Sequence, residues 1–170
     1  MKYVVMIIKV IDKISETVGK IASISVLFMV IFQFGEVVMR YFVGRPTVWT
    51  WEVSTYLYGA AFMLAAAWAL KEGKHVRTDF LYGKLSPKNK AILDLITFST
   101  IFLLFAGVLT YFTINSAIFS VSIREGSYTM TPIVIWPLKV AIAVGFSLLL
   151  LQGLAKIARD IIFLVKGETV

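Results

Sequence analysis

The sequence predicts an all-α integral membrane protein with four transmembrane helices, and three observations support this prediction. First, 59% of the 170 residues are hydrophobic and 16% are charged, whereas soluble domains average about 45–50% apolar and 25% charged residues. Second, four apolar segments are long enough to cross about 30 Å of hydrocarbon as helices. Third, lysine and arginine are concentrated in alternate connections between these segments, as in a multi-pass membrane protein.

The four predicted spans belong to one membrane domain that covers residues 1–170. The first contains a single acid, Glu36, near its far end, and the second contains no charged residue. The third would be about 43 Å long at 1.5 Å per residue, so it must tilt or protrude from the bilayer. The fourth contains Pro137 and Lys139. The predicted spans are residues 21–40, 53–70, 95–123 and 133–155, with a connection at 71–94.

Residues 2–20 combine lysines with apolar residues at helical spacing. A signal peptide is excluded because this basic region is too long and no small-x-small cleavage site follows it before Arg40. The pattern is typical of an amphipathic helix lying in the membrane interface. A continuous extension of the first span fits the pattern equally well.

Capping residues indicate where the later helices begin. Ser86 places a hydroxyl before Pro87, so we expect the third helix to start there. Thr131 and Pro132 predict the start of the fourth helix in the same way. Within that helix, Pro137 should cause a kink or a restart, because proline lacks a backbone donor and crowds the preceding turn.

The distribution of basic residues predicts the orientation. Four lysines precede the first span, six basic residues lie in the 71–94 connection, and three lie in the tail. The opposite side has Arg40, Arg45 and Arg124, and Lys139 lies inside a span. By the positive-inside rule, both termini and the 71–94 connection are therefore cytoplasmic. Since the basic residues lie between apolar runs, the net charge of +7 reflects topology, and we expect no nucleic acid partner.

Composition also excludes several classes of chemistry. The chain has no cysteine, which excludes disulfides, thiolate zinc sites and iron–sulfur clusters. Its single histidine, His75, excludes haem held by two axial histidines within the chain. There is no Ser/His/Asp arrangement, no cluster with metal-ligand spacing and no glycine-rich phosphate loop. We therefore expect no enzymatic activity, no metal and no cofactor in this chain.

Ionisable residues at membrane depth are costly and suggest function. Glu36 and Arg40 are four residues apart with the acid first, so they can form an ion pair on one helix face. Alternatively, Glu36 lies near the outer interface and is half solvated. Lys139 either extends toward the outer headgroups or forms an ion pair with Glu36 or Glu52.

The outward-facing segment 40–52 is rich in aromatic residues. It combines four of them, Tyr41, Phe42, Trp49 and Trp51, with Arg45, Pro46 and Glu52. Such rings favour the headgroup level, so the segment fits an aromatic belt. A short, stiff, charged and aromatic loop is equally suited to docking a partner, and the sequence does not separate the two readings.

Packing signals and helix breaks favour a subunit over a self-contained transporter. Ala61, Ala65 and Ala69 form a ladder of small residues that allows another helix to approach closely. Autonomous transporters usually have a matched pair of broken helices that form the substrate site. Here only one break is visible, at Pro137.

The ordered motifs resemble the DctQ-like small membrane subunit of tripartite ATP-independent periplasmic (TRAP) transporters. The most specific part is Glu36-x-x-x-Arg40-Tyr41, followed by Arg45-Pro46, Trp49 and Glu52. A second motif runs from Lys71 to Asp79 and includes Gly73, His75, Arg77 and Asp79, with Lys74 at a position where the family often has glycine. A looser match covers residues 126–137.

This resemblance implies an inner-membrane subunit of a sodium-driven uptake system for organic acids such as C4-dicarboxylates or sialic acids. The implied partners are a large permease subunit, which would hold the transport and sodium sites, a periplasmic substrate-binding protein, and membrane lipids. The small subunit itself would be non-catalytic. Two alternatives are a self-sufficient proton-coupled transporter, working as a homo-oligomer with Glu36 as its essential carboxylate, and the membrane anchor of a respiratory enzyme.

Overall fold

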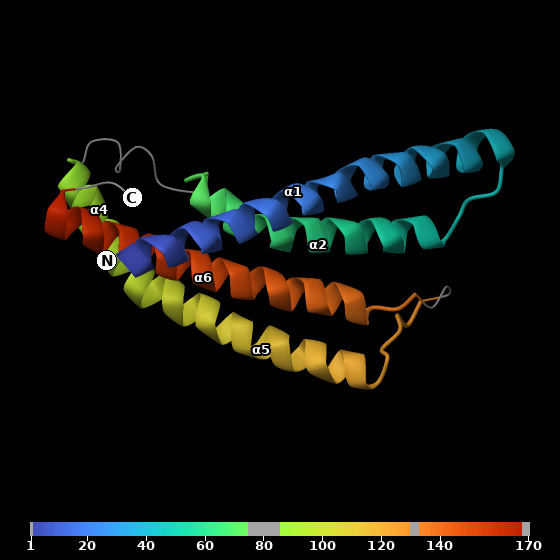
Figure 1. The fold of residues 1–170 in the computed structure, drawn as a ribbon. Coiled ribbons are helices and arrows are strands. Elements are labelled where there is room, and N and C mark those ends of the chain that lie inside the picture. Colours follow the sequence, from blue (N-terminus) through green and yellow to red (C-terminus); the bar gives the residue numbers. More distant parts are fainter. Residues whose placement is uncertain (1, 75–85, 130–132, 168–170) are drawn as a thin grey trace.

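The computed structural model describes residues 2–74, 86–129 and 133–167, and this part of the chain is almost entirely helical (Figure 1). Four helical segments are long and apolar enough to cross a membrane, which confirms the predicted fold class. Within the described residues there is no strand, and one isolated β-bridge joins Gly126 to Val134. In chain order, the elements are α1 (Lys2–Val38), η1 (Met39–Val43), α2 (Trp49–Lys71), α4 (Pro87–Thr97), η2 (Phe98–Phe102), α5 (Leu103–Ser122) and α6 (Trp136–Lys166).

The N-terminal segment is a continuous extension of the first span, not a separate interfacial helix. Helix α1 is unbroken over 37 residues and passes into the π-helical turn η1. The turn ends at Gly44, whose φ of 69° lies in the left-handed region that glycine adopts without a steric penalty. The amide of Arg45 then donates to the carbonyl of Met39 at 3.0 Å, which reverses the chain toward α2.

The third span begins where its capping residues predict. The Ser86 hydroxyl accepts a hydrogen bond from the Asn89 amide, and Pro87 occupies the first helical position of α4. Helices α4 and α5 are joined through the π-helical turn η2, which places Phe102 directly against Gly153 of α6.

Thr131 and Pro132, where we expected the fourth helix to start, lie outside the described residues, and the helix begins at Trp136. Residues 133–135 precede it and lie alongside 125–127. The Ser127 amide donates to the Ile133 carbonyl at 2.7 Å, and the Ile135 amide donates to the Glu125 carbonyl at 3.0 Å. These bonds hold residues 133–135 outside the helix. Pro137 therefore lies in the first turn of α6, where its missing donor has no helical partner to lose.

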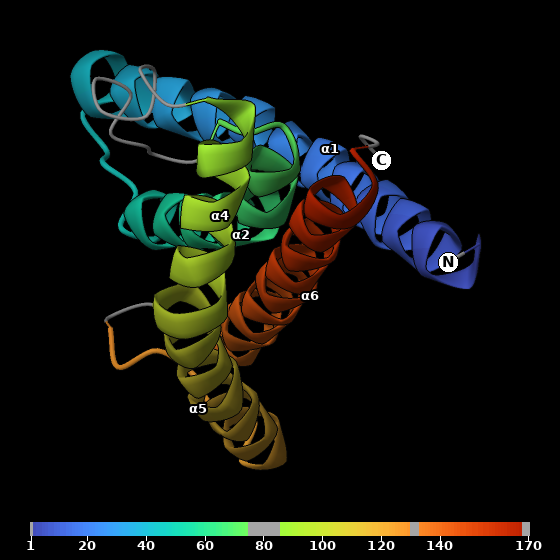
Figure 2. The same cartoon turned by 90° about the vertical axis from the view of Figure 1, so that its left-hand side faces the viewer.

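Helix α6 is the central element and contacts α1, α2, α4 and α5 (Figures 1 and 2). Small residues allow these contacts: Ala67, Ala106 and Ala155 are almost completely buried. Of the small-residue ladder predicted on α2, Ala61 is buried, whereas Ala65 and Ala69 are half-buried.

The helix ends divide the molecule into two chemically different ends. Ile8 near the start of α1 packs against Ala155 and Ile162 near the end of α6. We call the end of the molecule that contains these residues the charged end. We call the opposite end, formed by residues 39–52, 123–129 and 133–139, the aromatic end.

Candidate functional site

At the aromatic end, Glu36 pairs with Arg40 as their spacing predicts. Its Oε1 atom accepts from Arg40 Nε at 3.1 Å and from Arg40 Nη2 at 2.8 Å. The Glu36 side chain is 10% exposed, whereas that of Arg40 is 57% exposed. Arg40 thus stabilises the buried Glu36 carboxylate, while much of its own side chain remains exposed.

The second oxygen of Glu36 binds the connection that leads into α2. Glu36 Oε2 accepts from the Thr47 amide at 2.9 Å and from the Thr47 hydroxyl. The Thr47 and Thr50 hydroxyls lie 2.5 Å apart, and Thr50 is buried in the first turn of α2. Glu36 therefore holds the 44–48 connection against the end of α1. Both of its carboxylate oxygens take part in this structural role.

Tyr41, Arg45, Pro46 and Trp49 of the sequence signature are all exposed, and Trp49 also contacts α1. Trp49 packs edge-to-face on Phe32 of α1, with ring centroids 5.8 Å apart. Arg45 and Pro46 are exposed, and so are Tyr41 and its neighbour Phe42. The signature thus combines a fold-stabilising cluster with an exposed aromatic and basic surface.

Glu52 joins the two connections of the aromatic end. The carboxylate is buried and accepts from the Tyr56 hydroxyl at 2.6 Å and from the Thr129 hydroxyl at 2.6 Å. Thr129 belongs to the connection between α5 and α6. Glu52 therefore holds that connection against α2, and neither Thr129 nor its role was foreseen from the sequence.

Lys139 pairs with Glu125, so the expectation of a bridge to Glu36 or Glu52 is wrong. The Nζ atom lies 2.5 Å from Glu125 Oε2. The return of residues 133–135 alongside 125–127 brings Glu125 next to the first turn of α6. Because Lys139 donates a hydrogen bond to it, the pKa of the Glu125 carboxyl lies below its usual range.

This pair predicts a pH-dependent stability. A carboxyl with a lowered pKa stabilises the fold above its unfolded pKa, about 4.3, and this contribution is lost as the pH falls through the folded value. At neutral pH we expect Lys139→Met to lower the melting temperature in detergent by a few degrees. The difference from wild type should shrink as the pH falls below about 4, where the wild type also loses the pair.

The matched control is Lys166→Met, which removes an exposed lysine at the other end of α6 for which the described residues provide no ion pair. Its melting temperature should equal that of wild type at every pH. A difference between Lys139→Met and wild type that stays constant down to pH 3 would contradict the assigned pair.

Three residues of the second sequence motif, His75, Arg77 and Asp79, lie outside the described residues. Gly73 is described: its φ of 67° follows the end of α2, and its amide donates to the Leu70 carbonyl at 3.1 Å. Gly73 therefore ends α2 in the left-handed conformation that glycine favours.

The charged end contains a buried polar network that sequence reasoning missed. Gln152 of α6 is completely buried; its amide donates to Asp12 Oδ1 at 2.8 Å and its carbonyl accepts from Ser15 at 3.1 Å. Arg159 donates to both Asp12 oxygens at 2.5 Å. A glutamine within the apolar run 140–155 was the available signal, because polar side chains in such runs hydrogen-bond across helices.

Two further ion-pair clusters join helices at the same end. Lys156 of α6 lies 2.7 Å from Asp94 of α4 and 2.6 Å from Asp160. Glu16 of α1 lies 2.6 Å from Lys71 at the end of α2. Each cluster joins two helices that are distant in sequence. The charged groups of both clusters therefore hold the chain's own helices together.

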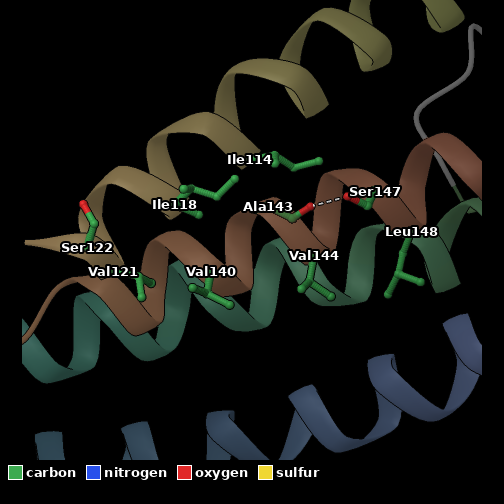
Figure 3. Close-up of a pocket in the computed structure, with 10 residues that line it drawn as sticks. Ile114, Ile118, Val121, Ser122, Val140, Ala143, Val144, Ser147 and Leu148 are labelled. Atoms are coloured by element: carbon green, nitrogen blue, oxygen red, sulfur yellow. Dashed lines mark hydrogen bonds between the residues drawn. The ribbon is translucent and has the colours of Figure 1, made fainter. Parts of the chain in front are cut away.

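An apolar groove of about 530 Å³ lies between the second half of α5 and the first half of α6 (Figure 3). Its lining contains no charged residue, and the hydroxyl of Ser147 is directed to the Ala143 carbonyl at 2.7 Å. Such a groove lacks the cations or amides that would recognise an organic acid.

The described residues also contain no cluster of His, Cys, Asp or Glu that could hold a metal ion. Four apolar helices joined by internal polar networks define a multi-pass α-helical membrane protein. The sequence matches the family described as "Tripartite ATP-independent periplasmic transporters, DctQ component" over residues 29–162. The chain belongs to this family, which confirms the resemblance. No curated protein matches it.

Membership of the family carries several consequences. Its members are transporter subunits, not enzymes, and the chain is accordingly a small TRAP transporter permease subunit. The family also implies a large permease and a periplasmic binding protein as partners. Together with the four apolar helices, it indicates a multi-pass protein of the inner membrane.

Proposed function

We propose that the chain is the non-transporting subunit of a sodium-driven TRAP transporter that takes up an organic acid. In this role it supports the large permease subunit, and its aromatic end faces the periplasm. The observation that supports the proposal best is the separation of its surfaces: the polar networks at both ends join the chain's own helices, whereas large apolar side chains along α1 and α5 are exposed.

The use of Glu36 argues against autonomous proton-coupled transport. Both of its oxygens already accept hydrogen bonds from Arg40 and Thr47, which are elements of the fold. A carboxylate that carries protons needs access to substrate or water. Here, protonating Glu36 would weaken the hydrogen bonds that hold the connection before α2. In line with what the family resemblance implies, our proposal assigns the sodium and substrate sites to the large subunit.

Exposed apolar surface supports a partner within the membrane. Helix α5 presents a broad face to its surroundings, and small residues on the opposite side pack against α6. Since lipid and another helix are both apolar, close packing with the large subunit depends on shape and van der Waals contact. The exposed members of this face on α5 are Leu104, Phe105, Val108, Tyr111, Phe112, Ile118 and Phe119, and Ile101 of η2 continues it.

The function is tested by purifying tagged protein from native membranes, identifying copurifying proteins by mass spectrometry and reconstituting uptake in liposomes. We expect a large permease to copurify. Sodium-dependent uptake should require that permease, this chain and a soluble binding protein together. Transport by this chain alone would overturn the proposal and support the homo-oligomeric alternative.

We further propose that the aromatic end takes part in docking the periplasmic binding protein. Arg45 is exposed and has no ion pair within the described residues, and Trp51, further along the same segment, is 76% exposed. Arg45→Glu should therefore impair uptake several-fold at limiting binding protein and leave assembly with the large subunit intact. The defect should weaken as ionic strength rises, because electrostatic docking is screened by salt.

Lys166→Glu is the charge-matched control, because it makes the same change of charge at the charged end. It should leave uptake unchanged. Loss of assembly in Arg45→Glu would instead indicate that Arg45 stabilises the small subunit, and equal uptake by both variants would exclude docking through Arg45.

A further inference from the structure

The first half of α1 has three distinct faces. Ile8, Ser15 and Gly19 form the buried face: Ile8 packs on α6, Ser15 bonds Gln152, and Gly19 contacts Trp68. With 3.6 residues per turn, two further sets of side chains fall about 120° to either side of this face. Both sets are exposed, and they differ in chemistry.

One exposed face is a stripe of lysines. Lys9, Lys13 and Lys20 lie within about 40° of one another around the helix, and all three are exposed. We call these three residues the lysine stripe. Lys20 is 2.5 Å from Glu16, whereas the described residues provide no ion pair for Lys9 or Lys13.

The other exposed face is apolar. Ile7, Val10 and Ile14 lie about 110° from the lysine stripe, and all three are exposed. An apolar face next to a lysine face is the arrangement of helices that lie at the boundary between acyl chains and headgroups.

The length of α1 requires such a location for its first half. The helical segment Tyr3–Val43 has 41 residues and would measure roughly 60 Å, about twice the thickness of the hydrocarbon. Within this segment, the longest stretch without a charged residue is 21–35. The part before residue 21 therefore extends out of the hydrocarbon and passes the level of the headgroups.

Among the described residues, the acids of the charged end pair with Lys20 but not with Lys9 or Lys13 of the lysine stripe. Asp12 binds Arg159, Asp94 and Asp160 bind Lys156, and Glu16 is shared between Lys20 and Lys71. These acids are already occupied in helix contacts. Lys9 and Lys13 thus present positive charge that no acid among the described residues compensates.

We propose that the lysine stripe binds the headgroups of anionic phospholipids while Ile7, Val10 and Ile14 contact the acyl chains. The contact fixes the depth of α1 and with it the level of the polar networks at the charged end. A lysine near an anionic membrane surface favours association by roughly fivefold. Long lysine side chains also reach headgroups while their methylene groups remain in apolar surroundings.

The test uses the full chain in phosphatidylcholine vesicles that contain a trace of spin-labelled phosphatidylglycerol. The wild type should select this lipid over spin-labelled phosphatidylcholine severalfold, and Lys9→Gln/Lys13→Gln should bring the ratio close to one. The control Lys74→Gln/Lys166→Gln removes two exposed lysines that follow α2 and end α6, and it should keep most of the selectivity. No selectivity in wild type, or equal loss in both variants, overturns the proposal.

A second measurement tests the geometry directly. The chain has no cysteine, so single nitroxide labels at Ile14→Cys and Lys13→Cys report depth without background. The label at 14 should be accessible to oxygen, and the label at 13 should also be accessible to a water-soluble relaxation agent. Equal exposure of both labels to the water-soluble agent would contradict the proposal. Both tests use symmetric vesicles, so they are independent of the proposed orientation and transport role.

Discussion

Asp12→Ala should cause one of the largest losses of stability available from a single substitution at the charged end. Asp12 accepts from Arg159 and from the amide of Gln152, which is completely buried. Without the carboxylate, a guanidinium only 19% exposed and a buried amide both lose their acceptor. Removing one partner of a largely buried network costs about 2–4 kcal/mol, more than the net contribution of the intact bonds.

Unfolding in mixed micelles with increasing SDS measures this loss. Glu72→Ala is the control, because Glu72 is 41% exposed and its nearest cation, Lys71, is 3.9 Å away. The control should stay within about 0.5 kcal/mol of wild type. Asp12→Asn should fall between the two, since it keeps an acceptor for Gln152 and loses the charge. Equal stability of Asp12→Ala and Glu72→Ala would show that the network does not stabilise the fold.

Local features of this fold could be predicted from the sequence. Glu36 and Arg40 are four apart on one helix, and Ser86 precedes Pro87, so both interactions depend only on residues within one turn. The four spans follow in the same way from the hydropathy of continuous segments. These interactions depend on the geometry of a single helix and not on how the helices pack together.

Contacts between distant residues could not be predicted in this way. Lys139 binds Glu125 because residues 133–135 return alongside 125–127, and no helical periodicity encodes that return. The same return delays the start of α6 to Trp136. Asp12 and Arg159 are 147 residues apart and meet only because α1 crosses the end of α6.

The candidate site shows the same division. Glu36 and Glu52 were singled out from sequence, yet their partners Thr47 and Thr129 were not, because a threonine in a loop is compatible with many contacts. Sequence also left open whether the aromatic segment docks a partner or stabilises the fold. The structure assigns Glu36, Trp49 and Glu52 to fold contacts and leaves Arg45 and Trp51 exposed.

Gly145→Ala should separate α6 from α2 and strongly destabilise the protein. A Cβ atom at Gly145 would lie 2.7 Å from the carbonyl oxygen of Met63 and 2.8 Å from its carbonyl carbon. Both are backbone atoms of a helix, so no rotamer change can relieve the contact, and the two helices must move apart along their whole interface. Overpacking of this kind costs about 1–3 kcal/mol, and leucine at this position should cost more.

Gly107→Ala is the matched control, since Gly107 also lies within an apolar helix and its Cβ would meet nothing within 4 Å. Alanine favours helix by up to about 1 kcal/mol over glycine, so this variant should be as stable as wild type or more stable. The two variants make the same chemical change, and only the proximity of Met63 distinguishes them. Because α6 contacts four other helices, Gly145→Ala should also reduce copurification of the large permease, whereas Gly107→Ala should not. If both variants unfold at the same SDS fraction, the close approach of α2 and α6 does not limit stability.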